Sequence, residues 1–143
     1  DEIRFWHDYV ERRDYFYDDK GRSGGLAEGS RFVVLGDLNS SVDEGDSRRE
    51  ALQALLNSKK VDDSAKPQSM GGLEHKPDSP FAAYHSVYWG MLADYVLPSM
   101  GNTQTLDSGV FWPTKSDELY RLVESRAASS DHRLVWLKIR LQD

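Results

Sequence analysis

The stretch Arg31-Phe-Val-Val-Leu-Gly-Asp-Leu-Asn39 joins a short apolar run to a carboxylate and a carboxamide. The run over 31–36 is rich in residues that favour β-structure, which is typical of a strand buried on both faces. If the extended backbone continues, Asp37 and Asn39 share a face and lie about 7 Å apart. A carboxylate can activate a water and an amide can stabilise charge on phosphoryl oxygens, so the pair suits phosphoryl chemistry. The alternative is an ordinary turn, which Asp and Asn commonly open.

A second acidic residue interrupts the apolar stretch Leu92-Ala-Asp-Tyr-Val-Leu97. Alternation places Asp94 between Leu92 and Val96 on one face of a strand that is apolar on both sides. A carboxylate in such a place is costly unless it is paired. We therefore expect a histidine, an arginine or a metal ion to meet Asp94. The alternative is an edge strand that leaves Asp94 in water.

A third polar group, Ser129-Ser-Asp-His-Arg133, directly precedes the last apolar alternation of the chain. That alternation predicts a strand over 133–141. Asp131 could bind a metal ion, and His132 could handle a proton or bind a phosphate. The alternative is a polar loop that leads into an amphipathic strand.

The first half of the chain adds two helices to the strand over 31–36. Helical spacing of large residues predicts a helix over 3–16, and four glycines predict a loop over 21–29. Ser47 has the capping-box spacing to Glu50, and the apolar stripe behind it predicts a helix over 47–56.

The second half is richer in extended patterns. A long polar connection over 59–80 leads to two predicted strands, over 84–89 and 92–97, joined through Gly90. A short strand is predicted over 110–112, followed by a helix through Val123 that Thr114 or Ser116 caps. This order predicts a mixed α and β fold rather than a regular βαβ series.

Composition narrows the classes of protein. The 143 residues suit one domain, and the formal net charge of −6 disfavours non-specific nucleic-acid binding. The absence of cysteine excludes disulfides, thiolate catalysis and cysteine-based metal sites, although it does not indicate a compartment. No run approaches the roughly 18 apolar residues of a membrane span, and residues 1–4 show no signal-peptide pattern.

Taken together, the three polar motifs resemble the last three motifs of the endonuclease/exonuclease/phosphatase superfamily, which has the deoxyribonuclease I-like fold. Their order matches, and each motif ends, occupies or begins a predicted strand. The resemblance implies half of a four-layer α/β/β/α sandwich, with one mixed, largely antiparallel sheet covered by helices. It also implies a divalent-metal-dependent phosphoesterase, which could be a phosphodiesterase, a nuclease or a phosphatase.

The resemblance also implies a role for each motif residue. Asp37 would orient or activate the attacking water, and Asn39 would hold the phosphoryl group. Asp131 would bind a divalent cation, either Mg²⁺ or else Mn²⁺ or Ca²⁺. His132 would contact the phosphate oxygens, oriented and kept cationic by Asp94. The substrate would be a phosphoester on a small molecule, a lipid or a nucleic acid.

The amino-terminal motifs of the superfamily are not recognisable. Its Gln-Glu step is missing, because the four glutamines precede Ala54, Ser69, Thr105 and Asp143. We therefore expect 1–143 to be the carboxy-terminal portion of such a domain, with a helix and Gly-rich loop over 1–30 and the motifs over 31–143. Its exposed sheet face would meet the missing amino-terminal half or a second copy, and the isolated chain would be inactive. The alternative function is a non-catalytic binding or interaction module that retains the fold.

Other candidates are weaker. A lone histidine in an aromatic strand or a polar loop is usually structural or solvated, which applies to His85 and His75. Trp89 and Trp112 lie near predicted strand ends, where they could line a substrate cleft.

Overall fold

A computed structural model describes residues 2–142 and confirms the mixed α+β class. There are three α-helices, namely α1 (Glu2–Val10), α2 (Glu50–Leu56) and α3 (Met70–His75), in the described part of the chain. Two short 3-10 helices are η1 (Ala82–Tyr84) and η2 (Glu118–Leu122). The strands are β1 (Val33–Asp37), β2 (Asp94–Pro98), β3 (Thr103–Val110) and β4 (Val135–Leu141).

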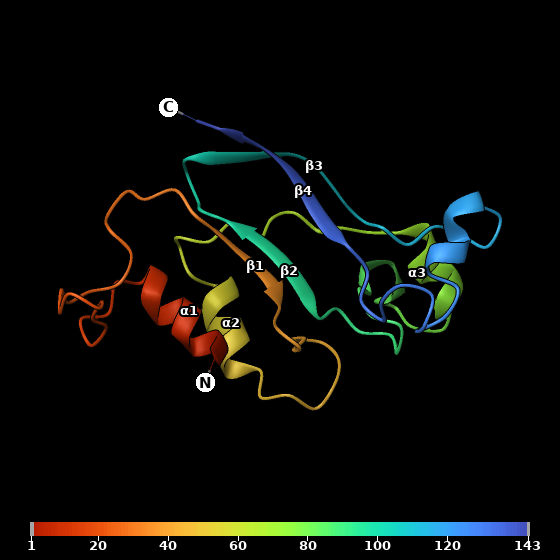
Figure 1. Ribbon diagram of the computed structural model, residues 1–143, viewed down its shortest axis with the longest axis horizontal. Coiled ribbons are helices and arrows are strands. Elements are labelled where there is room, and N and C mark those ends of the chain that lie inside the picture. Colours follow the sequence, from red (N-terminus) through yellow and green to blue (C-terminus); the bar gives the residue numbers. More distant parts are fainter. Residues whose placement is uncertain (1, 143) are drawn as a thin grey trace.

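The strands form two antiparallel pairs. Strand β1 pairs with β2, so that Asp37 lies opposite Asp94, and β3 pairs with β4 from Thr103–Leu141 to Val110–Val135. Strand β4 lies beside β2, so the two pairs adjoin (Figure 1). Over residues 2–142, the expected single sheet is therefore divided into two ladders.

Helices α1 and α2 lie side by side on one face of the β1–β2 pair (Figure 1). Leu52 and Leu55 of α2 are completely buried there, against Val34 and Leu97 of the strands. Burying one such leucine contributes about 1.5–3 kcal/mol. Side chains alternate along β1, so Leu35 points to the opposite face, where it is 68% exposed. The face away from the helices is thus uncovered at Leu35.

Helix α1 is shorter than the spacing of large residues predicts. It ends at Val10 rather than at residue 16, because Arg12 adopts a left-handed φ of 63°. The aromatic side chains that gave the helical spacing still cluster, since Phe16 packs edge-on against Phe5 and Tyr9. The loop after α1 folds back so that Phe16 packs on the helix. Its large residues therefore continue the helical spacing in the sequence although they are not part of the helix.

The predicted start of α2 is also wrong. The helix begins at Glu50, and Ser47 makes no cap, because its hydroxyl bonds to that of Ser40 at 2.7 Å. A tertiary partner has replaced the expected local one.

The long connection holds a further helix. Helix α3 begins after Ser69, whose hydroxyl accepts a hydrogen bond from the backbone N–H of Gly72 at 3.0 Å. Gly71 lies against the backbone carbonyl of Trp112, where a larger side chain would collide. Two adjacent glycines, which weaken a helix on propensity alone, are therefore required here by packing.

Three predictions in the second half need correction. Residues 84–89 form no strand: η1 is followed by a turn at Gly90, where Val87 bridges to Met91 and to His132. The strand expected over 110–112 lies earlier, as β3. The last predicted helix is the 3-10 turn η2, capped by Asp117, whose carboxylate accepts the Leu119 N–H at 2.8 Å.

Among residues 2–142, no helix combines the length and the apolar composition needed to cross a lipid bilayer.

Candidate active site

The backbone turns sharply where β1 ends. Gly36 has a φ of 139° and Asn39 a left-handed φ of 45°, so the extended alternation does not continue to Asn39. The Asp37 carboxylate accepts a hydrogen bond from the Asn39 N–H at 2.7 Å. The turn interpretation of these residues is therefore correct for the backbone. It leaves both polar side chains at the end of the strand.

Asp94 and His132 meet directly. Nδ1 of His132 lies 3.0 Å from Oδ2 and 3.1 Å from Oδ1 of Asp94. The Ser86 hydroxyl donates a second hydrogen bond to Oδ2 at 2.7 Å. The buried end of the Asp94 carboxylate thus has the partners that its position in an apolar strand requires.

Asp37 completes a cluster with these two residues. Nε2 of His132 lies 3.9 Å from Oδ2 of Asp37, and one ligand atom from each of the three residues lies within 4.8 Å of the others. The strand register explains this convergence, because Asp37 and Asp94 are opposite each other on β1 and β2. Exposure of the side chains rises from 16% for Asp94 to 29% for His132 and 45% for Asp37. The cluster therefore opens to solvent at Asp37.

The two carboxylates of the cluster, Asp37 and Asp94, repel each other when both are ionised. Two carboxylates about 4 Å apart repel by roughly 4 kcal/mol at an effective dielectric near 20. A protonated His132 between Asp37 and Asp94 offsets that repulsion. A divalent cation can do the same, and the three residues offer the carboxylate and imidazole atoms that such ions bind.

Asp131 has a different environment. Its carboxylate pairs with the guanidinium of Arg126 at 2.6 Å, and this hydrogen bond lowers the pKa of Asp131 below its ordinary value. Its backbone carbonyl accepts the N–H of Tyr88 at 2.8 Å. In the described part of the chain, the structure does not bring Asp131 into the cluster of Asp37, Asp94 and His132.

A buried arginine holds the segment that carries His132. The side chain of Arg133 donates to the backbone carbonyls of Ser130, at 2.5 Å, and Val123, at 2.9 Å, and it lies over the ring of Trp112. Burial lowers the pKa of this guanidinium. These contacts hold the backbone on either side of His132 in place, and none of them involves the imidazole itself.

The aromatic side chain of Trp89 borders the site. Trp89 meets the ring of His132 edge-on, with centroids 5.4 Å apart, and the guanidinium of Arg126 lies 5.7 Å above the Trp89 ring. The sequence predicts Trp89 as a possible cleft residue. It does not predict Arg126 or Ser86, because an isolated Arg or Ser in a loop forms no recognisable motif.

The remaining histidines make structural contacts. His85 is buried, with Nε2 3.0 Å from the carboxylate of Glu44, and Nε2 of His75 lies 2.6 Å from the backbone carbonyl of Tyr88. These contacts agree with the structural role that the sequence favoured for both.

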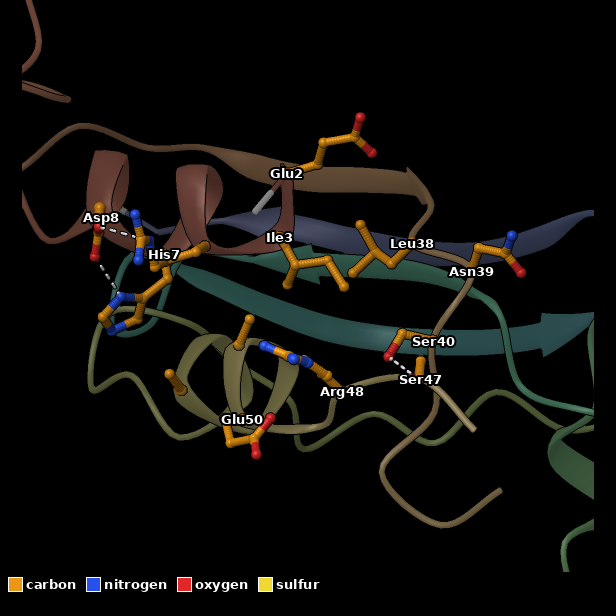
Figure 2. A pocket seen from close by; sticks show the side chains of 13 residues that line it. Glu2, Ile3, His7, Asp8, Leu38, Asn39, Ser40, Ser47, Arg48 and Glu50 are labelled. Atoms are coloured by element: carbon orange, nitrogen blue, oxygen red, sulfur yellow. Dashed lines mark hydrogen bonds and ion pairs between the residues drawn. The ribbon is translucent and has the colours of Figure 1, made fainter. Parts of the chain in front are cut away.

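Three hollows lie at or near the site, and His132 lines one of about 280 Å³ beside Ser130 and Arg133. A groove of about 830 Å³ runs between α1 and α2, where Ile3 faces Leu38 and Ser40 bonds to Ser47 (Figure 2). Asn39 stands at one end of it, but its lining among residues 2–142 includes neither Asp94 nor His132. A smaller hollow of about 260 Å³ reaches Asp94 from the loop over 41–44. Of these two hollows, only the smaller one is lined by a residue of the cluster, Asp94.

Comparison with known proteins identifies the family. The model of the family described as "Endonuclease/Exonuclease/phosphatase family" matches residues 2–132 of the chain. In comparisons with curated proteins and with solved structures, nothing matches the chain. The match covers most of the sequence and includes Asp37, Asn39, Asp94 and His132. The chain therefore belongs to the endonuclease/exonuclease/phosphatase family, whose members are generally hydrolytic enzymes such as nucleases and phosphatases.

Proposed function

We propose that this chain carries the phosphate-handling residues of a divalent-metal-dependent phosphoric ester hydrolase. The observation that carries the proposal is the convergence of Asp37, Asp94 and His132, whose ligand atoms lie within 4.8 Å of one another. Membership of a hydrolytic family supports the reaction class. The substrate is a phosphodiester or a phosphomonoester.

Each residue has a role that suits its environment. Asp37, the most exposed of the three, takes a proton from a water molecule whose oxygen attacks phosphorus. The bond from phosphorus to the leaving oxygen breaks, the leaving oxygen takes a proton from solvent water, and Asp37 returns to solvent the proton that it accepted. Asp94 holds His132 as an imidazolium, which contacts the phosphate oxygens. The carboxamide of Asn39, on the turn beside Asp37, steadies the phosphoryl group.

The donors available suit a hard cation such as Mg²⁺, because carboxylate oxygens predominate. Asp131 is the proposed ligand, and the carboxylates of Asp37 and Asp94 are the alternative donors. When bound, the cation neutralises charge on the phosphate and on the leaving oxygen. The Asp131 carboxylate is already paired with Arg126, so this ion pair must break before Asp131 can bind the cation.

We further propose that the uncovered face of the β1–β2 pair meets another polypeptide surface. The exposure of Leu35 supports this, because the helices that pack against β1 lie on its other face. The covering surface is an amino-terminal half of the same domain or a second copy of the chain, and 1–143 is the carboxy-terminal portion of that domain. Size-exclusion chromatography tests the second copy. A stable monomer at all concentrations would exclude it.

The test of the proposed function is hydrolysis of a chromogenic phosphodiester and phosphomonoester, with Mg²⁺ or Mn²⁺, by a longer chain that includes the proposed amino-terminal half. Asp37→Ala and His132→Ala should each abolish hydrolysis while the unfolding midpoint stays close to that of the unaltered protein. Asp46→Ala, at an exposed carboxylate in the following loop, is the matched control. Activity of either site variant within about tenfold of the unaltered protein would remove that residue from the mechanism.

Calorimetric titration with Mg²⁺ separates hydrolase from binding module. Metal binding without hydrolysis of any phosphoester, in this chain and in a longer one, would favour a non-catalytic role. Hydrolysis that depends on the metal would exclude that role.

A further inference from the structure

Ser86 connects the two halves of the Asp94–His132 pair. It is completely buried, in the short irregular stretch between η1 and the turn at Gly90. Its backbone N–H donates to the carbonyl of Met91 at 3.0 Å, and its own carbonyl accepts the N–H of Arg133 at 2.7 Å. One residue therefore touches the segment before Asp94 and the residue directly after His132.

The hydroxyl of Ser86 has one possible orientation. Its oxygen accepts two backbone hydrogen bonds, from the N–H of Ala93 and of Asp94, both at 3.0 Å. A hydroxyl has two acceptor sites and one donor, so both acceptor sites are filled. The proton must point along the remaining direction, which leads to Oδ2 of Asp94 at 2.7 Å.

This arrangement fixes the carboxylate. Asp94 binds the same hydroxyl through its backbone N–H and through its side chain, which closes a ring and restricts side-chain rotation. The carboxylate then faces Nδ1 of His132 at 3.0 Å. Because an ionised carboxylate only accepts hydrogen bonds, Nδ1 must carry the proton, and Nε2 is the atom that turns toward Asp37.

We propose that Ser86 is a positioning residue for the Asp94–His132 pair: its hydroxyl fixes the Asp94 carboxylate, which in turn keeps a proton on Nδ1 of His132 and fixes the direction of the imidazole. The catalytic part of this inference rests on the proposed hydrolase function. The geometric part does not, because it concerns the state of His132 in the protein alone. Ser86 touches no reacting atom and acts through Asp94.

The experiment compares Ser86→Ala with Ser99→Ala. Ser99 is also buried, at the opposite end of β2, where its hydroxyl accepts the N–H of Phe32 at 3.3 Å and donates to Asn102 at 2.5 Å. Both variants lose a buried hydroxyl that bonds backbone and side chain. Only Ser86→Ala loses one that contacts Asp94.

The first readout is the ¹⁵N spectrum of the His132 imidazole in the full chain, with the pH raised in steps until the spectrum itself shows the neutral ring. The unaltered protein and Ser99→Ala should show the proton on Nδ1. Ser86→Ala should show a mixture of the two tautomers. A pure Nδ1–H form in Ser86→Ala, or its loss in Ser99→Ala as well, would overturn the proposal.

The second readout is kinetic. Ser86→Ala should lower kcat by about 10- to 100-fold, as expected for losing a hydrogen bond to a charged group, with KM changed less than about twofold. Ser86→Thr, which keeps the hydroxyl, should recover most of kcat. If Ser86→Ala fails to fold, Ser86→Cys keeps the size with a weak donor and should show the same tautomer mixture.

An unchanged kcat with mixed tautomers would contradict the catalytic part. Absence of hydrolysis in the unaltered longer chain that includes the proposed amino-terminal half would contradict the proposed function and leave the tautomer result to decide the geometric part.

Discussion

The Asp94 carboxylate lies 3.0 Å from Nδ1 of His132, although 38 positions separate the two residues in the sequence. The β1–β2 register places Asp94 opposite Asp37, and the bridge between Val87 and His132 brings the imidazole to the same place. Backbone pairing thus builds the cluster, and side-chain hydrogen bonds complete it.

Replacement of Asp94 by Asn tests the pair. We expect kcat to fall by at least about 100-fold, because a neutral amide cannot hold an imidazolium as the carboxylate does. Residues that act as a unit have non-additive effects, so the double variant with His132→Ala should be no slower than the worse single variant. Steady-state kinetics of the four proteins measure this. Additive losses would mean that Asp94 and His132 act separately.

A second prediction separates the backbone of Asn39 from its side chain. At its φ of 45°, alanine should destabilise the fold by about 1 kcal/mol, whereas glycine adopts the conformation without strain. Asn39→Gly should therefore unfold at a higher denaturant concentration than Asn39→Ala. Both should lose hydrolysis, since neither has the carboxamide. Activity in Asn39→Gly close to that of the unaltered protein would show that only the turn matters.

The sequence predicts the positions of β1, β2 and β4 well, because each has a continuous apolar or alternating pattern of strand length. It fails where a distant contact replaces a local one. Ser47 bonds to Ser40 instead of capping a helix, and Gly71 is fixed by the carbonyl of Trp112. These choices depend on chain segments that meet only after folding.

The candidate site shows the same contrast between residues that a local sequence pattern identifies and residues whose role depends on contacts made after folding. Asp37, Asp94 and His132 are identifiable because each polar residue interrupts or flanks an apolar strand pattern. Ser86 is not, because its importance comes from the saturation of one hydroxyl by two backbone groups and a carboxylate. The pairing of Asp131 with Arg126 is likewise invisible in the sequence, where the two are simply polar residues of one loop.

A third prediction concerns pH. The hydroxyl of Tyr15 donates to the Asp8 carboxylate at 2.7 Å and, as the largest influence, lowers the pKa of Asp8 below its ordinary value of 3.8. The bond therefore stabilises the folded state while Asp8 is ionised, and this stabilisation is lost as pH falls through the lowered pKa. Tyr15→Phe should raise the pKa of Asp8 and be less stable than the unaltered protein at neutral pH.

The stability difference should shrink as the pH falls below the ordinary pKa of Asp8, because protonated Asp8 no longer favours the folded state through this bond. Carboxyl NMR titration gives the pKa, and urea unfolding at several pH values gives the difference. Tyr17→Phe, at a more exposed tyrosine, is the control and should change neither. A difference that is constant down to about pH 2 would mean that packing, not the Asp8 charge, explains the effect.

A fourth prediction contrasts the two faces of the β1–β2 pair. Leu52→Ala should lower the free energy of unfolding by about 2–5 kcal/mol, because Leu52 is completely buried between α2 and the strands. Leu35→Ala should change it by less than about 0.5 kcal/mol, since Leu35 is largely exposed on the other face. Urea unfolding at two protein concentrations checks both. A Leu35→Ala loss as large as that of Leu52→Ala, growing with protein concentration, would show that the Leu35 face is buried between copies of the chain.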